Sequence, residues 1–440
     1  MNQTIREIME FIEEHDAKFI RLAFCDIFGV QKNISIMSSE LERAFTEGIS
    51  FDASFVDGFM NVEDSDLLLF PDPATMATLP WRSSQGMVVR FFCFIRYPDG
   101  RPFEGDGRYL LSKTIQKTRK RQMNCKIGLE CEFYLFEKDE NGNPTRIPQD
   151  QAGYLDIAPL DKGENIRRNV CLTLEEMDIH ITSSHHKGGP GQNEIVFRHT
   201  NVLDAADNLI TFKSVVKTLA FQNGLYASFL PKPLPGKNGS GLHVNLSLSN
   251  LKDENLFRIG GGEHNPDCES FIAGILDKAV DMSVFLNPLI NSYARFGEFG
   301  APEHISWSHQ NRSQMIRIPA ARGAYARMEM RSPDPCLNPY LAFHLLIEAG
   351  LWGIEKKLNL TPPCNIDLYD AEDEDLEGYT MLPKNLKAAV KLAEQSEFIR
   401  GALPEKTIEC YISAKKKEWQ DYILSEDKSV KEDALYFLYY

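Results

Sequence analysis

The chain has 440 residues, of which 43% are hydrophobic and 25% are charged, and its formal net charge at pH 7 is −15. Such a composition is typical of a globular protein with a large core, and the negative charge argues against nucleic acid as a partner. The sequence has no basic and apolar leader and no long apolar run, so we expect no membrane insertion and a cytoplasmic location. Its nine cysteines are scattered without a CxxC pair, which argues against both a disulfide framework and a structural zinc ribbon.

The first hundred residues are predicted to form a small domain of helix and strands. The sequence favours a helix over 5–14, two strands over 19–36 that turn at Gly29, and a further strand over 88–97. Turn-forming residues follow at Tyr97-Pro98-Asp99-Gly100 and Gly105-Asp106-Gly107. We therefore expect two domains, residues 1–104 and residues 105–440.

The remainder of the chain alternates helical segments with short strands. Helices are predicted over residues 205–223, 269–286, 339–357, 384–397 and 406–423. Asn338 and Pro339 are a good N-cap and first-turn pair for the third of these. The acidic stretch 372–377 is predicted to be a solvated loop. The aromatic tail 433–440 is expected to pack on a neighbouring subunit, because so many exposed rings would be unfavourable in water.

Four short segments alternate apolar and polar residues with the period of a β-strand. They are KIGLECEFYLF (126–136), NEIVFR (193–198), GLHVNLSL (241–248) and RMEMR (327–331). In each segment the polar residues share one face. This pattern is typical of a sheet with one face on the core and the other face on a polar site.

Any one such face is most simply exposed to solvent, but the four together favour a shared site. The polar faces would hold Glu130, Glu132, Glu194, Glu329 and His243, and several carboxylates can share a site only when cations hold them together. A ligand set rich in carboxylates suits Mg²⁺ or Mn²⁺. Nearby arginines suit phosphoryl and carboxylate oxygens, and they are Arg295, Arg312, Arg317, Arg327 and Arg331. Metals combined with arginines indicate phosphoryl transfer.

One cation in this group is unexpected. The segment SSHHKGGPGQNEIVF (183–197) has two histidines, a glycine-rich turn and Glu194, and it would suit a divalent ion if Lys187 did not lie in the middle.

In their order and spacing, the motifs resemble the glutamine synthetase family of the bacterial type I class. They are FDASF, GLECEFYLF, AGYLDIAPLD, HHKGGPGQNEI, PKPLPGKNGSGLHVNLSL, NRSQMIRIP and RMEMRSPDPCLNPYLA. The resemblance covers nearly the whole chain. It implies an α+β fold with an N-terminal β-grasp domain and a catalytic domain built on a curved antiparallel sheet flanked by helices. It further implies a homo-oligomer, a dodecamer with active sites between subunits, to which Asp52 would come from the adjacent chain.

The resemblance also implies a reaction in which ATP phosphorylates the γ-carboxylate of glutamate and ammonia or another amine then attacks. Glu130, His243 and Glu329 would hold the Mg²⁺ or Mn²⁺ beside the ATP phosphates, and Glu132 and Glu194 would belong to the metal nearer glutamate. Catalytic roles would fall to Asp52, Arg312 and Arg331. The remaining expected contacts are Asn238, Gly239, Arg295, Arg312 and Arg331 for glutamate, and Asn245, Ser247, Arg312, Arg317 and Arg327 for ATP.

The sequence departs from the family pattern at three positions. Lys187 replaces a metal-binding glutamate, Gly300 replaces a glutamate of the flap, and Phe55 replaces a serine beside Asp52. The last two changes favour a larger amine than ammonium, for which related ligases that join glutamate to larger amines are the precedent. Lys187 admits three interpretations: a side chain in solvent, an internal cation between Glu132 and Glu194, or the loss of chemistry.

Three hypotheses about function follow. The first is glutamine synthesis from ammonia, and the second is a γ-glutamyl ligase for an alkylamine or polyamine. The third is a catalytically weak nucleotide-binding homologue, which the retained metal and arginine positions argue against.

Overall fold

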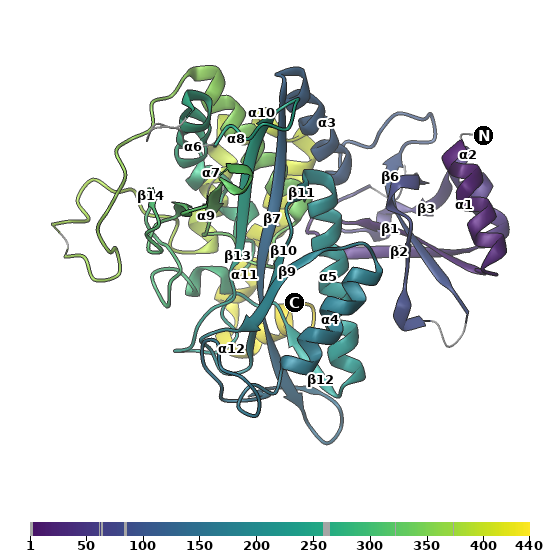
Figure 1. The fold of residues 1–440 in the computed structure, drawn as a ribbon, viewed down its shortest axis with the longest axis horizontal. Helices are drawn as coiled ribbons and strands as arrows, with labels where there is room; N and C mark the ends of the chain where they lie inside the picture. Colours follow the sequence, from purple (N-terminus) through teal and green to yellow (C-terminus); the bar gives the residue numbers. More distant parts are fainter. Residues whose placement is uncertain are drawn as a thin grey trace.

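The structure is a computed structural model that describes residues 3–60, 62, 65–82, 86–257, 265–321, 323–372 and 374–440. A small N-terminal part lies beside a larger part, through which the long strand β7 (Met123–Lys138) runs from top to bottom in Figure 1. The fold is α+β, as the sequence predicted. Among the described residues, no helix has both the length and the apolar character that crossing a membrane requires.

The N-terminal part is built on a sheet with strand order β2-β1-β6-β4-β3, and β5 pairs with β6. Its strands are β1 (Phe19–Cys25), β2 (Gln31–Met37), β3 (Ile49–Asp52), β4 (Asp66–Pro71), β5 (Ala77–Thr78) and β6 (Val88–Arg96). The helices of this part are α1 (Gln3–Glu14) and α2 (Leu41–Thr46). The predicted pair of strands around Gly29 is confirmed, because β1 and β2 pair antiparallel on either side of that turn. The division of the chain at residues 104 and 105 stays a prediction.

The second sheet has the strand order β14-β15-β16-β13-β7-β10-β9, and three short strands pair elsewhere along β7. Beside β7, its strands are β8 (Pro144–Pro148), β9 (Ile181–His186), β10 (Gln192–Phe197), β11 (Thr200–Asn201), β12 (Leu225–Ser228), β13 (Leu242–Asn250), β14 (Trp307–His309), β15 (Ile316–Ile318) and β16 (Met328–Met330). The pairings are antiparallel except that of β14 with β15, which is parallel. The sheet is therefore antiparallel, as the resemblance implied, except at this edge, which makes it mixed.

The alternation predicted for the strands is confirmed in β7. Ile127, Leu129 and Cys131 are at most 1% exposed and lie on the core face. Glu130 and Glu132 lie on the opposite face, where Glu130 is in register with His243 of β13 and Glu132 is in register with Glu194 of β10. On the next strand over, Glu329 of β16 is opposite Asn245 of β13. A row of polar residues thus crosses neighbouring strands of the sheet.

Helices cover the second sheet, and each of the five segments predicted to be helical overlaps at least one of them. Those in the chain after β6 are α3 (Gly107–Lys120), α4 (Glu164–Glu176), α5 (Val202–Gln222), α6 (Pro266–Asp277), α7 (Ala279–Leu286), α8 (Pro339–Lys356), α9 (Leu386–Gln395), α10 (Glu397–Ala402), α11 (Glu405–Leu424) and α12 (Lys428–Glu432). The single helix predicted over 269–286 was wrong, because the backbone leaves the helical geometry at Lys278 and begins again as α7. Likewise the segment 384–397 ends at Ser396, whose hydroxyl accepts from the Ile399 N–H and caps α10.

The start of α8 joins the two parts of the chain. Asn338 caps the helix through the N–H groups of Tyr340 and Leu341, and its side-chain amide donates to the backbone carbonyls of Asp26 and Ile27. Gly29 has a φ of +80°, and a Cβ there would lie 2.7 Å from the Asn338 Cα. Gly29 therefore does more than form the predicted turn, since its missing side chain lets the β1–β2 turn approach α8.

Two segments near the C-terminus were singled out in the sequence, the acidic stretch 372–377 and the aromatic tail 433–440. The described residues of the acidic stretch, Glu372 and 374–377, form a largely exposed turn as predicted, and Asp373 lies outside the described residues. In the aromatic tail, Tyr436 and Phe437 are buried against their own chain, and the Phe229 N–H donates to the Tyr440 carbonyl at 2.8 Å. The tail therefore does not need a neighbouring subunit to cover these rings.

Candidate active site

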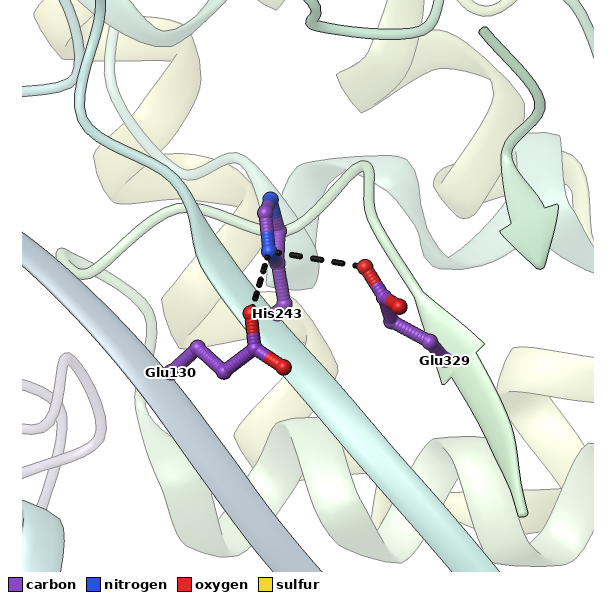
Figure 2. Close-up of side chains that lie close together, drawn as sticks. All are labelled: Glu130, His243 and Glu329. Carbon is purple, nitrogen blue, oxygen red and sulfur yellow. Dashed lines mark hydrogen bonds and ion pairs between the residues drawn. The ribbon is translucent and has the colours of Figure 1, made fainter. Parts of the chain in front are cut away.

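Three side chains from three adjacent strands converge at the centre of the second sheet. Figure 2 shows Glu130 of β7, His243 of β13 and Glu329 of β16 pointing toward one another. His243 Nδ1 lies 3.2 Å from Glu130 Oε2 and 3.6 Å from Glu329 Oε1. One ligand atom from each residue lies within 4.8 Å of the others. Two carboxylates and an imidazole at this spacing are a donor set that suits Mg²⁺ or Mn²⁺.

The two carboxylates of this group are held in their ionised form. Burial alone would raise the pKa of Glu130, but hydrogen bonding to His243 and Asn245 and the charge of His243 hold that pKa well below its usual range. Burial would likewise raise the pKa of Glu329, but the charges of His243, Arg331 and Arg317 lower it. Both groups are therefore available as anionic ligands at neutral pH.

Arginines surround the same carboxylates. Arg331 Nη1 donates to Glu329 Oε1 at 2.8 Å, and Arg317 pairs with the other oxygen of Glu329. Arg295 is 3% exposed and donates to the carbonyls of Ser332 and Arg331, both at 2.8 Å. These contacts fix planar guanidinium groups beside the carboxylates, where they can meet phosphoryl or carboxylate oxygens of a ligand.

A cavity of about 620 Å³ opens onto this face of the sheet. It is lined by most of the residues that the sequence singled out, namely Glu130, Glu132, Glu194, His243, Lys187, Asn238, Gly239, Arg295, Arg312, Arg331 and Gly300. Four residues expected to contact ATP do not line it, and they are Asn245, Ser247, Arg317 and Arg327. Of these, Asn245 links Glu130 to Arg327, because its side-chain amide donates to Glu130 Oε1 and its side-chain carbonyl accepts from Arg327 Nε.

Asp52 and Phe55 lie apart from this cavity. Both belong to the N-terminal part, where Phe55 is 88% exposed and Asp52 is also exposed. The Ser54 hydroxyl and N–H donate to Asp52 Oδ1 and lower the pKa of that carboxyl. Neither residue lines the cavity of its own chain.

Lys187 follows β9 directly, and its side chain enters the cavity instead of pointing to solvent. Its Nζ lies 2.9 Å from Glu132 Oε1 and 3.4 Å from Glu194 Oε2. Burial alone would lower the pKa of Lys187, but the charges of Glu132 and Glu194 outweigh burial and raise it. An ammonium group therefore lies between the two carboxylates.

Two further side chains lie beside Lys187: His185, one of the two histidines that the sequence grouped with Glu194, and Tyr154, which was not singled out. His185 Nε2 lies 2.9 Å from Glu194 Oε2, and the Tyr154 ring packs against the edge of His185 with its centroid 5.9 Å from Lys187 Nζ. The register of β9 with β10 places His185 opposite Glu194. Which of the two histidines faces Glu194 depends on this register, which the sequence alone does not give. Tyr154 comes from a loop with no periodic signal.

A glycine turn brings the backbone close to Arg295. A Cβ at Gly239 would lie 2.5 Å from the Pro231 carbonyl oxygen and 2.8 Å from Arg295 Cγ. The Gly241 N–H donates to Glu132 Oε2 at 2.7 Å, and Gln192 Nε2 donates to the Gly239 carbonyl at 2.9 Å. The turn therefore positions Glu132 as well as the wall of the cavity.

Gly300, which also lines the cavity, leaves open space. Its φ is +86°, and a Cβ built there meets no atom within 4 Å. Arg331 Nη2 donates to the Gly300 carbonyl at 3.1 Å, which ties this segment to the arginine cluster. The nearby Glu298 lines the cavity and pairs with Lys232 Nζ at 2.5 Å.

Behind Lys187, a second group of acidic residues and a histidine forms a buried network. His186 Nδ1 contacts the Lys187 carbonyl at 2.7 Å and its Nε2 contacts Asp150 Oδ1 at 3.0 Å. Asp150 and Asp161 also accept backbone N–H groups, and Arg167 pairs with Asp161 at 2.5 Å. Because these atoms already have hydrogen-bond partners, the network serves to position the turn after β9.

This network predicts a pH-dependent contribution to stability. Burial would lower the pKa of His186, but its hydrogen bonds to Asp150 and to the Lys187 carbonyl raise that pKa. Burial would raise the pKa of Asp150, but hydrogen bonds from His186 and from the Gly191 N–H lower it to about 2. Because the pKa of His186 is higher in the folded than in the unfolded chain, protonated His186 contributes to the free energy of unfolding. This contribution is fully present below the pKa of histidine in the unfolded chain, about 6.5, and is lost as the pH rises through the pKa in the folded chain. We expect His186→Gln to destabilise the protein more at pH 6 than at pH 9. Urea unfolding of both proteins across this range measures the difference, and a penalty independent of pH would contradict it.

Comparison with known proteins identifies the family. Residues 104–432 match the family "Glutamine synthetase, catalytic domain" and residues 16–98 match "Glutamine synthetase, beta-Grasp domain". The chain is 43% identical over 431 residues to a glutamine synthetase of Methanosarcina mazei, with 95% of each chain covered. It is 44% identical over 427 residues to one of Clostridium saccharobutylicum, with 95% of this chain and 96% of the relative covered.

Solved structures agree with this result. A GmaS–ADP complex superimposes with a TM-score of 0.87 and 28% identity, covering 97% of this chain and 99% of that one. GmaS without ligand gives a TM-score of 0.86 with the same identity and coverage. The predicted β-grasp and catalytic domains are thereby confirmed. The chain belongs to the glutamine synthetase family and is an ATP-dependent glutamate ligase.

Proposed function

We propose that this enzyme uses ATP to phosphorylate the γ-carboxylate of glutamate and transfers the γ-glutamyl group to ammonia, which forms glutamine. The observation that carries the proposal is the group of Glu130, His243 and Glu329, with Arg331 and Arg317 paired to Glu329. Glu130, His243 and Arg331 line a cavity of about 620 Å³. The relatives that are more than 40% identical carry the same name, glutamine synthetase.

The donor set of Glu130, His243 and Glu329 fits a divalent ion, Mg²⁺ or Mn²⁺, beside the ATP phosphates. When bound, such an ion neutralises charge on phosphoryl oxygens. We assign the nucleotide side to Asn245, Ser247, Arg317 and Arg327, which lie beyond this group on β13, β15 and at the start of β16. Arg312 and Arg331 would neutralise the phosphoryl group in transfer, because fixed cations stabilise charge that develops there.

The glutamate would bind on the other side of the cavity. Asn238, Gly239 and Arg295 form that wall, and buried Arg295 is held by backbone carbonyls in a fixed orientation. Such preorganised groups favour the reacting geometry before the substrate arrives. The γ-carboxylate would then face Lys187 and Arg331.

The amine side of the reaction depends on a second subunit in this proposal. Asp52 is exposed, ionised and outside the cavity of its own chain, as a carboxylate that serves an adjacent subunit would be. We therefore propose a homo-oligomer, a dodecamer with active sites between subunits, in which Asp52 binds the ammonium and takes its proton.

A second candidate substrate is an alkylamine or polyamine. Gly300 leaves open space at the cavity wall, and Phe55 next to Asp52 presents an exposed ring. Both features would accommodate the carbon atoms of a larger amine.

An amine panel distinguishes the two candidates. Phosphate release and product mass are measured with ATP and glutamate plus ammonia, methylamine, ethylamine, ethanolamine or putrescine. We expect the highest kcat/KM with ammonia and glutamine as its product. A higher kcat/KM with any organic amine would favour the second candidate, and glutamate-dependent phosphate release with no amide product would contradict both. Omission of glutamate is the control for ATP hydrolysis.

A further inference from the structure

The side chain of Lys187 lies at a fixed place within the row of polar residues. Its backbone N–H donates to the Gln192 carbonyl at 2.8 Å, and its own carbonyl lies 2.7 Å from His186 Nδ1. The side chain is 21% exposed, and Nζ contacts Glu132 and Glu194, which are each less than 10% exposed. The buried network behind β9 and the turn ahead of it thus hold the ammonium group in the cavity.

The carboxylates around Lys187 are arranged differently from those in the group of Glu130, His243 and Glu329. Within the described residues, donor atoms close enough to share one ion are found for Glu130, His243 and Glu329, but not for Glu132 and Glu194 with a third ligand. Glu132 Oε2 already accepts from the Gly241 N–H, and its Oε1 lies 2.9 Å from Lys187 Nζ. Glu194 Oε2 lies 2.9 Å from His185 Nε2. Three of the four carboxylate oxygens therefore face N–H or ammonium groups, and the fourth, Glu194 Oε1, is buried without a hydrogen-bond partner.

The charges account for this difference. Exchanging a glutamate for a lysine at one position changes the local charge by +2, which equals the charge of one divalent ion. Two carboxylates with one ammonium, and three carboxylates with one divalent ion, both leave a net charge of −1. Burying carboxylates without a cation is strongly unfavourable, and either arrangement supplies the cation.

We propose that the Lys187 ammonium permanently takes the place of the divalent ion on the glutamate side, so that each active site binds one divalent ion in the absence of nucleotide. This inference rests on the proposed function, because that function is what places glutamate on the Lys187 side of the cavity. The residues Glu132, Glu194 and Lys187 do not fit a divalent ion, whereas Glu130, His243 and Glu329 do. The cation facing the γ-carboxylate would then be part of the chain and independent of metal concentration.

Metal counting on the oligomer without nucleotide tests the proposal. Mn²⁺ is titrated into wild type, Lys187→Glu and Lys162→Glu, and bound ion per subunit is measured by electron paramagnetic resonance and calorimetry. We expect one ion in wild type and two in Lys187→Glu. Lys162→Glu reverses the same charge on an exposed residue of the preceding loop and is expected to bind one. Two ions per wild-type subunit, or one in folded Lys187→Glu, would overturn the proposal.

Anomalous diffraction from wild-type crystals soaked in Mn²⁺ keeps the test decisive if Lys187→Glu does not fold. We expect a peak between Glu130, His243 and Glu329 and none between Glu132 and Glu194, and a peak at the latter place would refute the proposal. These measurements do not depend on turnover. A single bound ion together with an absent amide product would therefore contradict the proposed function and leave the role of Lys187 standing.

Discussion

Glu130→Gln is expected to lower kcat by about 10³-fold while leaving the fold intact, which corresponds to about 4 kcal/mol of lost transition-state stabilisation. The glutamine side chain keeps the shape of glutamate and can still accept from Asn245 Nδ2 at Oε1. The substitution removes the negative charge that lies 3.2 Å from His243 Nδ1. It thereby also removes one of the two anionic ligands of the group shown in Figure 2. The measurement is the steady-state rate of glutamate-dependent ADP formation.

Glu137→Gln provides the matched control. Glu137 lies on the same strand, β7, but is exposed and outside the cavity. We expect this variant to retain the wild-type rate. If Glu130→Gln kept more than about a tenth of wild-type kcat, the assignment of this group to the phosphoryl-transfer chemistry would be wrong.

Arg108→Met is expected to cost about 3–5 kcal/mol of unfolding free energy. Arg108 is 4% exposed and pairs with Asp207 of α5 at 2.9 Å and with Asp72 of the N-terminal part at 2.8 Å. Tyr340 of α8 also donates to Asp207, at 2.7 Å. Methionine fills similar space, but it leaves the buried Asp207 carboxylate without a cation, and that uncompensated charge causes the loss.

Urea unfolding measures this effect, and Arg101→Met is its control. Arg101 pairs with Asp99 at 2.7 Å on the exposed turn before α3, where water screens the charges. The control is expected to leave the unfolding midpoint unchanged. Equal midpoints for Arg108→Met and wild type would show that Arg108 does not hold the two parts of the chain together.

Much of the site could be predicted because it depends on local periodicity. The alternation places Glu130 and Glu132 on the polar face of β7, and His243 on the polar face of β13, without any knowledge of the partner strands. Which strands are neighbours is a property of long-range pairing, so the sequence alone could not show that Glu132 is opposite Glu194 and Glu130 opposite His243. For the same reason, the parallel pairing of β14 with β15 was missed.

The remaining errors have local causes. The break at Lys278 was missed because apolar residues continue across it with helical spacing, and neither Gly nor Pro marks it. The aromatic content of the tail indicates burial but not which surface covers each ring: Tyr436 and Phe437 are buried in their own chain, whereas Leu438 and Tyr439 are exposed there, and their packing on a neighbouring subunit stays a prediction. The chemistry of Lys187 was left open between three interpretations, and only the distances to Glu132 and Glu194 exclude a side chain that points to solvent.

We propose that the phosphoryl-transfer half of the site is complete, whichever amine follows. Trapping with hydroxylamine, a small nucleophile that converts an acyl phosphate to a hydroxamate, tests this directly. We expect γ-glutamyl hydroxamate to form only when ATP, glutamate and Mg²⁺ or Mn²⁺ are all present, and to fall by about 10³-fold in Glu130→Gln. Tight ATP binding by the wild-type oligomer without hydroxamate under these conditions would show that the site binds nucleotide but does not phosphorylate glutamate.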